Sequence, residues 1–144
     1  NLYQLFSGIS KLTNLRSLHL HRGYLLFIAD DFSELNLSNC VMSFNPLKKL
    51  PDFTKMKNLV HLAISGLPEL EEPEKQVEQL AQVESLKELS TQGTEVLDIF
   101  TKLKYLPQLN RINIGHPSFS TEQTAALKAD MSPITVWVQH YKNQ

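Results

Sequence analysis

One nine-residue phrase recurs along this 144-residue chain and constrains its fold more than any other feature. The phrase occurs over residues 12–20 (LTNLRSLHL), 56–64 (MKNLVHLAI) and 106–114 (LPQLNRINI), and poorer copies begin at Phe32 and Val83. Apolar residues in each copy stand three apart and then two apart. The three-residue spacing fits an irregular or helical approach. The closing alternation fits a short strand with one buried and one exposed face.

A unit of this kind cannot bury its own apolar residues, because it consists of only one short strand and the short irregular or helical segment before it. Stacked units cover one another, and their strands then pair side by side into a parallel sheet. The phrase resembles the leucine-rich-repeat pattern, LxxLxLxxN preceded by a further apolar position. The resemblance covers nearly the whole chain. It implies an α/β solenoid with a parallel sheet on the concave face and short helices or irregular segments on the convex face.

The apolar residue at the centre of each expected strand gives the register of the repeats. These residues are Leu18, Leu35, Leu62, Leu89, Ile112 and Val136. Leucine-rich repeats are about 20 to 29 residues long, and all the steps between these centres fit that range except the first. The step from Leu18 to Leu35 is 17 residues (35 − 18). Either this repeat has a very tight convex side, or the strand expected at Leu35 lies elsewhere.

The segments outside the strands predict two helices. Residues 74–83 combine good helix formers with apolar residues at 77, 80 and 81, and Pro73 before them suits a first helical turn. Ser120 and Gln123 have the spacing of a capping box and predict a helix through about Asp130. A closing strand is expected over residues 135–138. The resemblance therefore implies one domain over residues 1–144, with about five to six repeats and a C-terminal capping unit at 118–144.

The N-terminal end lacks the polar cap that a terminal repeat needs for solubility. Leu2, Leu5, Phe6 and Ile9 begin a repeat at once, and the first residue is Asn1 rather than Met. We therefore expect the chain to be a fragment of a larger protein. We also expect this uncapped N-terminal face either to self-associate or to leave the first repeat mobile.

Charge and cysteine content exclude several classes of protein. Lys and Arg number 14 against 15 Asp and Glu, so the basic surplus typical of nucleic-acid-binding proteins is absent. The single cysteine, Cys40, excludes an intrachain disulfide framework and a multi-cysteine zinc site. This favours a cytoplasmic setting, or delivery into a host cell, over a disulfide-rich extracellular one. No apolar run approaches the roughly 18 to 20 residues that span a bilayer, so no membrane partner is expected.

The strand residues that flank the buried centres are expected to form a polar binding surface on the concave face. Trp137 is the most informative of them, because an exposed tryptophan is a good interface anchor; alternatively, it packs against the last helix or the tail. The strand at Leu35 decides whether Glu34 and Asn36 belong to this surface. The candidate partner-binding residues are Ser17, His19, His21, Glu34, Asn36, His61, Glu88, Ser90, Arg111, Asn113 and Trp137.

Catalytic and cofactor-binding patterns are weak in this sequence. His19, His21 and His61 could converge on the concave face, but no carboxylate or cysteine completes a convincing set of metal ligands. Cys40 lacks the surroundings of a catalytic cysteine and is expected at the asparagine position of its repeat. The five glycines are scattered and form no phosphate loop. We therefore expect no cofactor, no metal and no catalysis in this chain.

The function favoured by these observations is that of a protein–protein interaction module whose partner lies across the concave strands. The alternative is a substrate-recognition or sensor arm of a multidomain enzyme whose catalytic domain lies upstream of residue 1. Leucine-rich-repeat domains similar to this one occur in bacterial effectors, in receptors and in recognition arms. The resemblance thus implies a fold and a mode of binding rather than a particular partner.

Overall fold

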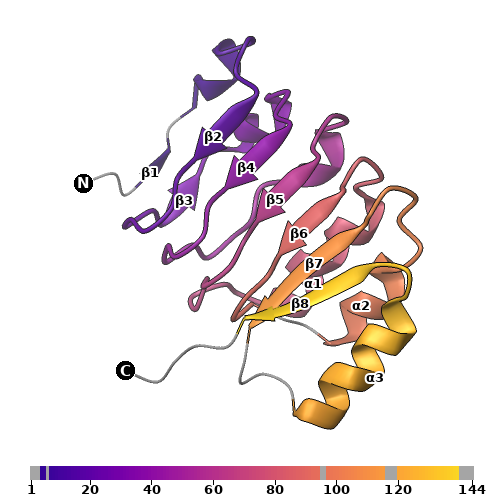
Figure 1. The fold of residues 1–144 in the computed structure, drawn as a ribbon. Helices are drawn as coiled ribbons and strands as arrows, with labels where there is room; N and C mark the ends of the chain where they lie inside the picture. Colours follow the sequence, from indigo (N-terminus) through magenta and orange to yellow (C-terminus); the bar gives the residue numbers. More distant parts are fainter. Residues whose placement is uncertain (1–3, 6, 95–96, 116–119, 140–144) are drawn as a thin grey trace.

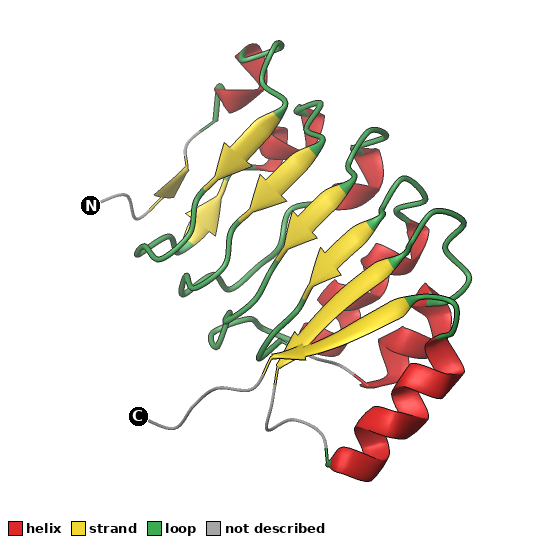
Figure 2. Ribbon diagram, viewed as in Figure 1, coloured by secondary structure: helices red, strands yellow, loops and turns green. Residues whose placement is uncertain are grey.

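A computed structural model shows the chain as an α/β solenoid in which short parallel strands alternate with helical segments (Figure 1). The structure describes residues 4–5, 7–94, 97–115 and 120–139. The strands form one layer and the helical segments lie behind it (Figure 2). The main sheet is parallel throughout, and its strands in spatial order are β2 (Ser17–His19), β4 (Asn39–Val41), β5 (His61–Ala63), β6 (Glu88–Ser90), β7 (Arg111–Gly115) and β8 (Thr135–Gln139).

In the part of the chain that the structure describes, the second layer consists of three α-helices and four short 3-10 helices. Both predicted helices are confirmed: residues 74–83 form a helix that starts at Pro73 and tightens into a 3-10 turn, and the capping box of Ser120 and Gln123 makes both of its hydrogen bonds. None of the described helices is long and apolar enough to cross a membrane. The helical segments are η1 (Ile9–Lys11), η2 (Asp30–Glu34), η3 (Phe53–Lys55), α1 (Pro73–Glu78), η4 (Gln79–Gln82), α2 (Leu97–Leu103) and α3 (Thr121–Met131). Two further strands, β1 (Gln4–Leu5) and β3 (Phe27–Ile28), form a separate parallel pair.

The prediction of a strand at Leu35 is wrong, because the strand of this repeat is centred on Cys40. Cys40 pairs with Leu18 on one side and with Leu62 on the other. Both steps are then 22 residues (40 − 18 and 62 − 40), which removes the short repeat. The cysteine is only 1% exposed and fills the strand centre as a small apolar side chain. Leu35 instead follows η2, where it is buried from the helical side.

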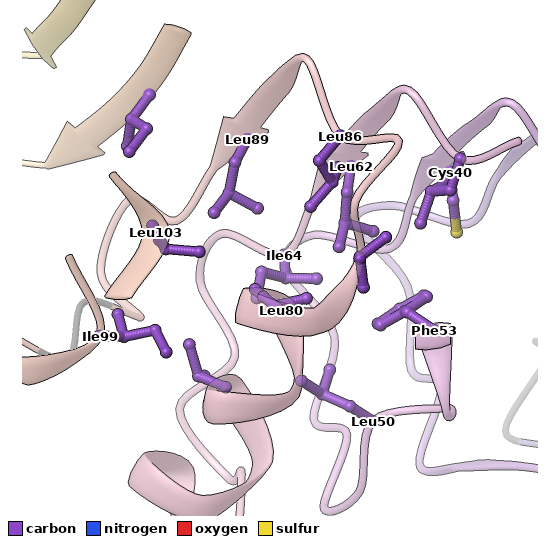
Figure 3. Close-up of a cluster of buried hydrophobic side chains, with 14 of the residues drawn as sticks. Cys40, Leu50, Phe53, Leu62, Ile64, Leu80, Leu86, Leu89, Ile99 and Leu103 are labelled. Atoms are coloured by element: carbon purple, nitrogen blue, oxygen red, sulfur yellow. The ribbon is translucent and has the colours of Figure 1, made fainter. Parts of the chain in front are cut away.

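The core consists of columns of apolar side chains that run through the stack at equivalent positions of successive repeats. The strand centres from Cys40 to Val136 are all buried. Leu62 and Leu89 point from the sheet into the same interior as Leu80 of η4 (Figure 3). Each strand thus buries its inward side chains against the neighbouring strands and the helical layer. This contact compensates for the small area that one repeat could bury alone.

A buried asparagine closes the turn after β4. The amide nitrogen of Asn45 donates hydrogen bonds to the carbonyl oxygens of Leu20 and Met42, and its oxygen accepts one from the backbone N–H of Leu25 at 3.2 Å. Asn45 therefore joins two consecutive repeats through their backbones. It also occupies the asparagine position of the pattern, where Cys40 had been expected. The expectation for Cys40 was wrong because it followed from the strand at Leu35.

The first repeat is less well covered than the others. Leu15, Leu18 and Leu20 are only half-buried, although the same positions of the next repeat are fully buried. The cause is that β2 is an edge strand of the main sheet, and no other strand of the described residues pairs with its outer side. Leu5 and Ile9, from the segment expected to be bare, are likewise half-buried. Leu2 and Phe6 lie outside the described residues.

Two threonines after β6 allow a matched test of what a buried hydroxyl costs. Thr91 is 1% exposed, and its hydroxyl has no hydrogen-bond partner among the described residues. The hydroxyl of Thr94 accepts a hydrogen bond from the backbone N–H of Leu67 at 3.3 Å. A buried hydroxyl without a hydrogen-bond partner destabilises the folded state. Removal of a hydroxyl that accepts a hydrogen bond leaves the donating N–H group without a partner. We expect Thr91→Val to raise the free energy of unfolding by about 1 kcal/mol and Thr94→Val to lower it by about 1–2 kcal/mol.

Urea denaturation followed by far-UV circular dichroism measures both changes. A larger stability loss in Thr91→Val than in Thr94→Val would show that the Thr91 hydroxyl has a partner and that its environment is polar.

Self-association through the N-terminal face stays a prediction, and the partly exposed leucines of the first repeat give it a specific test. Leu20 and Val138 occupy equivalent positions at the two edges of the sheet, and both are half-buried. We expect the sedimentation coefficient to rise with protein concentration, because exposed apolar surface and an unpaired strand edge favour association. Leu20→Lys should abolish this rise and Val138→Lys should not. A protein that sediments as a monomer at every concentration contradicts the prediction.

Candidate functional site

The outward side of the main sheet is the surface on which the sequence-predicted site residues gather. Alternate strand residues point away from the helical layer, so none of the described helical segments covers them (Figure 1). We call this surface the sheet face. It consists of Ser17, His19, Asn39, Val41, His61, Ala63, Glu88, Ser90, Arg111, Asn113, Thr135 and Trp137.

Most of the predicted site residues lie on the sheet face, and three do not. His21 is exposed just beyond the end of β2. Glu34 belongs to η2, and Asn36 lies in the loop before β4, where its side-chain oxygen accepts a hydrogen bond from Asn58 at 2.7 Å. The expected strand positions of these two residues were wrong for the same reason as that of Leu35. The eight that the structure brings together are Ser17, His19, His61, Glu88, Ser90, Arg111, Asn113 and Trp137.

Four members of the sheet face are not among the predicted residues. Ala63 and Thr135 lie on strands that were predicted, whereas Asn39 and Val41 lie on the strand that sequence reasoning misplaced. The 22-residue step supplies the signal that could have found them, because it places these residues opposite Ser17 and His19. Val41 and its neighbour Ala63 make the middle of the face less polar than expected. Both side chains are half-buried.

One row of the sheet face carries its charges. His61, Glu88 and Arg111 are neighbours on consecutive strands. The Nδ1 atom of His61 lies 3.3 Å from a carboxylate oxygen of Glu88, and both side chains are nearly half exposed. Water screens a pair this exposed, so it contributes well under about 1 kcal/mol to stability. In this structure the Glu88 carboxylate lies on the side of β5 rather than that of β7.

Arg111 and Trp137 form the most distinctive contact of the sheet face. The guanidinium of Arg111 lies over the indole ring of Trp137, 4.6 Å from the ring centroid. Its Nε atom donates a hydrogen bond to the side-chain oxygen of Asn113 at 3.3 Å. Trp137 remains 56% exposed, so its ring has an open side as well. Trp137 is therefore exposed, and Arg111 contacts its ring. The tail of residues 140–144, against which Trp137 was alternatively expected to pack, lies outside the described residues.

Two hollows lie next to each other on this face. One has a volume of about 390 Å³ and is lined by Gln92, Arg111, Asn113, Trp137, Val138 and Gln139. The other, of about 180 Å³, lies over β4, β5 and β6, where the side chains of Val41, Ala63 and Ser90 are small. Asn113 lines both hollows. A partner could therefore place consecutive side chains into them along one line across the strands.

A larger hollow, of about 650 Å³, lies on the helical side, and its walls are held by internal hydrogen bonds. The side-chain amide of Gln76 accepts a hydrogen bond from the N–H of Leu50 and donates one to the carbonyl of Lys48. Gln79 makes the same kind of pair with Phe53 and Pro51. These amides tie the irregular segment after β4 to α1 and η4. The hollow is therefore a cleft between repeats in which the side-chain amides of Gln76 and Gln79 already bind the backbone.

The structure also shows the positions of the cysteine considered as a nucleophile and of the histidines considered as metal ligands. Burial raises the pKa of the Cys40 thiol to about 12, so the thiolate that a nucleophile requires is not formed near neutral pH. His61 lies two strands away from His19. Within the described ranges, no three His, Cys, Asp or Glu side chains are arranged to hold a metal ion.

Comparison with known proteins adds no assignment: no protein-family model matches the sequence, and no curated protein shows significant similarity to it. Fold and site geometry are therefore the basis for the function proposed below.

Trp137 and Arg111 should contribute little to folding, because both lie on the open side of the sheet. We expect Arg111→Gln and Trp137→Ala each to lower the free energy of unfolding by about 1 kcal/mol or less, the usual range of an exposed cation–π contact. Ile112→Ala, a change at the buried neighbour of Arg111, should lower it by about 2–5 kcal/mol. Urea denaturation followed by circular dichroism gives all three values. Losses above about 2 kcal/mol at the two surface positions would assign the pair a structural role.

Proposed function

We propose that this chain is a leucine-rich-repeat domain that binds a partner protein through its sheet face. The observation that carries the proposal is the solvent-exposed Trp137, stacked on Arg111 beside an open hollow. Tryptophan and arginine are the residues most enriched among those that dominate binding energy at protein interfaces. An apolar ring exposed at this position makes little contribution to the core, and contact with a partner would bury it.

The backbone of the second repeat supports the family assignment. Residues 40–45 (CVMSFN) follow the LxLxxN part of the pattern, with Cys40 and Met42 buried in the core. Asn45, the last residue of the segment, bonds to backbone groups of the preceding repeat. An asparagine at this position of a stacked fold can link two adjacent repeats, because its amide satisfies backbone groups of the repeat before it.

The shape of the sheet face supports a protein partner rather than a small molecule. Its two hollows are open and lie side by side over several strands, whereas small-molecule sites enclose most of their ligand. Small side chains in the middle leave room for side chains of a partner, and the larger Arg111 and Trp137 stand at one end. If the chain were the recognition arm of a larger enzyme, the same surface would bind the enzyme's protein substrate.

Site-specific photo-crosslinking tests the proposal. A benzophenone amino acid is placed at Ala63 in the middle of the sheet face and, as a matched control, at the exposed Ala125 of α3. In an extract of the cells that produce the protein, we expect a defined adduct from position 63 and none from position 125. The adduct should disappear when Trp137→Ala is added, because an anchor tryptophan typically contributes 2 kcal/mol or more, at least about thirtyfold in affinity. Equal adducts from both positions, or one that Trp137→Ala leaves unchanged, would refute binding through this face.

A further inference from the structure

We infer that the hollow beside Arg111 and Trp137 is a binding site for a carboxylate, and that the partner presents it as an acidic side chain next to an apolar one in an extended peptide segment. This inference rests on the proposed function, since it specifies the chemistry of a partner on the sheet face.

Arg111 is held in place by contacts that leave its two terminal nitrogens available. The ring of Trp137 supports the plane of the guanidinium, and Asn113 binds its Nε atom. A guanidinium has five N–H donors in a fixed fork, and the hydrogen bond to Asn113 uses one of them. The remaining donors match the two oxygens of a carboxylate. Because the plane is already fixed, little conformational entropy is lost when such a ligand binds.

The nearest carboxylate on the sheet face does not neutralise Arg111. Glu88 stands directly opposite Arg111 on the neighbouring strand, but its carboxylate is 3.3 Å from Nδ1 of His61 on the other side. Arg111 takes part in none of the ion pairs of the described residues, which join His61 to Glu88, Lys75 to Glu72, Lys102 to Glu78 and Lys104 to Asp130. Among the described residues no carboxylate is paired with Arg111, so its terminal N–H groups can bind the carboxylate of an external ligand.

The lining of the hollow matches the same ligand. Besides Arg111 and Trp137 it contains the amides of Gln92, Asn113 and Gln139 and the side chain of Val138, and no carboxylate. Amide N–H groups can bind carboxylate oxygens or the backbone of a peptide. The exposed indole offers a flat apolar surface next to the guanidinium. An acidic residue followed by an apolar residue would satisfy both features at once.

A lone arginine favours a peptide over a nucleic acid. Binding to a phosphate backbone relies on several cations that release counterions together. Arg111 is the one Lys or Arg of the described sheet face, and the whole chain has a formal net charge of −1. Phosphate is therefore the competing ligand in the experiment rather than part of the proposal.

The arrangement also assigns a role to His61 and Glu88. The Glu88 carboxylate lies toward His61 in this structure, which leaves Arg111 open to the partner. Without His61 that carboxylate loses this contact and can turn to Arg111 as a competing internal ligand. His61→Ala should therefore weaken carboxylate binding. Glu88→Gln removes the competitor and should strengthen it. His61 and Glu88 are positioning residues in this scheme, and Arg111 makes the contact.

Trp137 is the single tryptophan of the sequence, so its fluorescence reports directly on the site. The probes are the capped peptide Gly-Leu-Glu-Leu-Gly, the same peptide with Gln in place of Glu, and inorganic phosphate. We expect a saturable change in Trp137 emission with the Glu peptide and an affinity at least about tenfold lower for the Gln peptide, because a charge-assisted hydrogen bond is lost. Arg111→Gln should remove this preference and Arg111→Lys should retain part of it.

Arg22→Gln is the matched control, because the guanidinium of Arg22 also lies over an aromatic ring, that of Phe44 at 5.4 Å, at the opposite end of the sheet. It should leave the preference unchanged, and circular dichroism verifies that every variant is folded. Equal affinity for the two peptides, absence of any saturable change, binding of phosphate as tight as that of the Glu peptide, or loss of the preference in Arg22→Gln would each overturn the inference. A partner that crosslinks at position 63 but tolerates Arg111→Gln would overturn it and leave the proposed function standing.

Discussion

The stacking of strand centres in register is the contact on which the rest of this structure depends. Cys40, Leu62, Leu89 and Ile112 are buried against one another through consecutive parallel pairs. Because side chains alternate along a strand, burial of this column forces the residues on either side of it to the opposite face. The sheet face is therefore a direct consequence of the core. A one-residue slip of any strand would bury its surface residues and expose its core.

This coupling explains what could be predicted from the sequence and what could not. The phrase around Leu62 and Leu89 fixes strand, register and surface residues together, and all of these predictions are confirmed. At Leu35 the same pattern occurs in a segment that forms a 3-10 helix, because its leucine is buried from the other layer. Cys40 was overlooked as a strand centre, since a cysteine differs from the leucine of the pattern although it is equally apolar when buried. The single error moved the predicted surface from Asn39 and Val41 to Glu34 and Asn36.

The hydrogen bonds that hold the irregular segments were not predictable, because they join residues with no common period. Gln76 and Gln79 look like ordinary helix residues in the sequence, yet their amides satisfy the backbone of the preceding segment more than 20 residues away. Buried or half-buried backbone groups require such partners wherever the chain forms neither a helix nor a strand. Asn45 performs the same task on the other side of the repeat. Side-chain amides thus replace secondary structure at the places where the repeats are joined.

The two ends of the sheet face differ, and the difference follows from what covers each end of the stack. At the β2 end the leucines of the first repeat are partly exposed, so the apolar surface there belongs to the core. At the β8 end α3 packs behind the last strand and Val136 is buried, so the exposed Trp137 is not part of an incomplete core. Its side chain lies on the sheet face rather than among the buried residues. The guanidinium over its ring, the hollow beside it and the position of the Glu88 carboxylate toward His61 support the proposal that this end of the sheet face recognises another molecule.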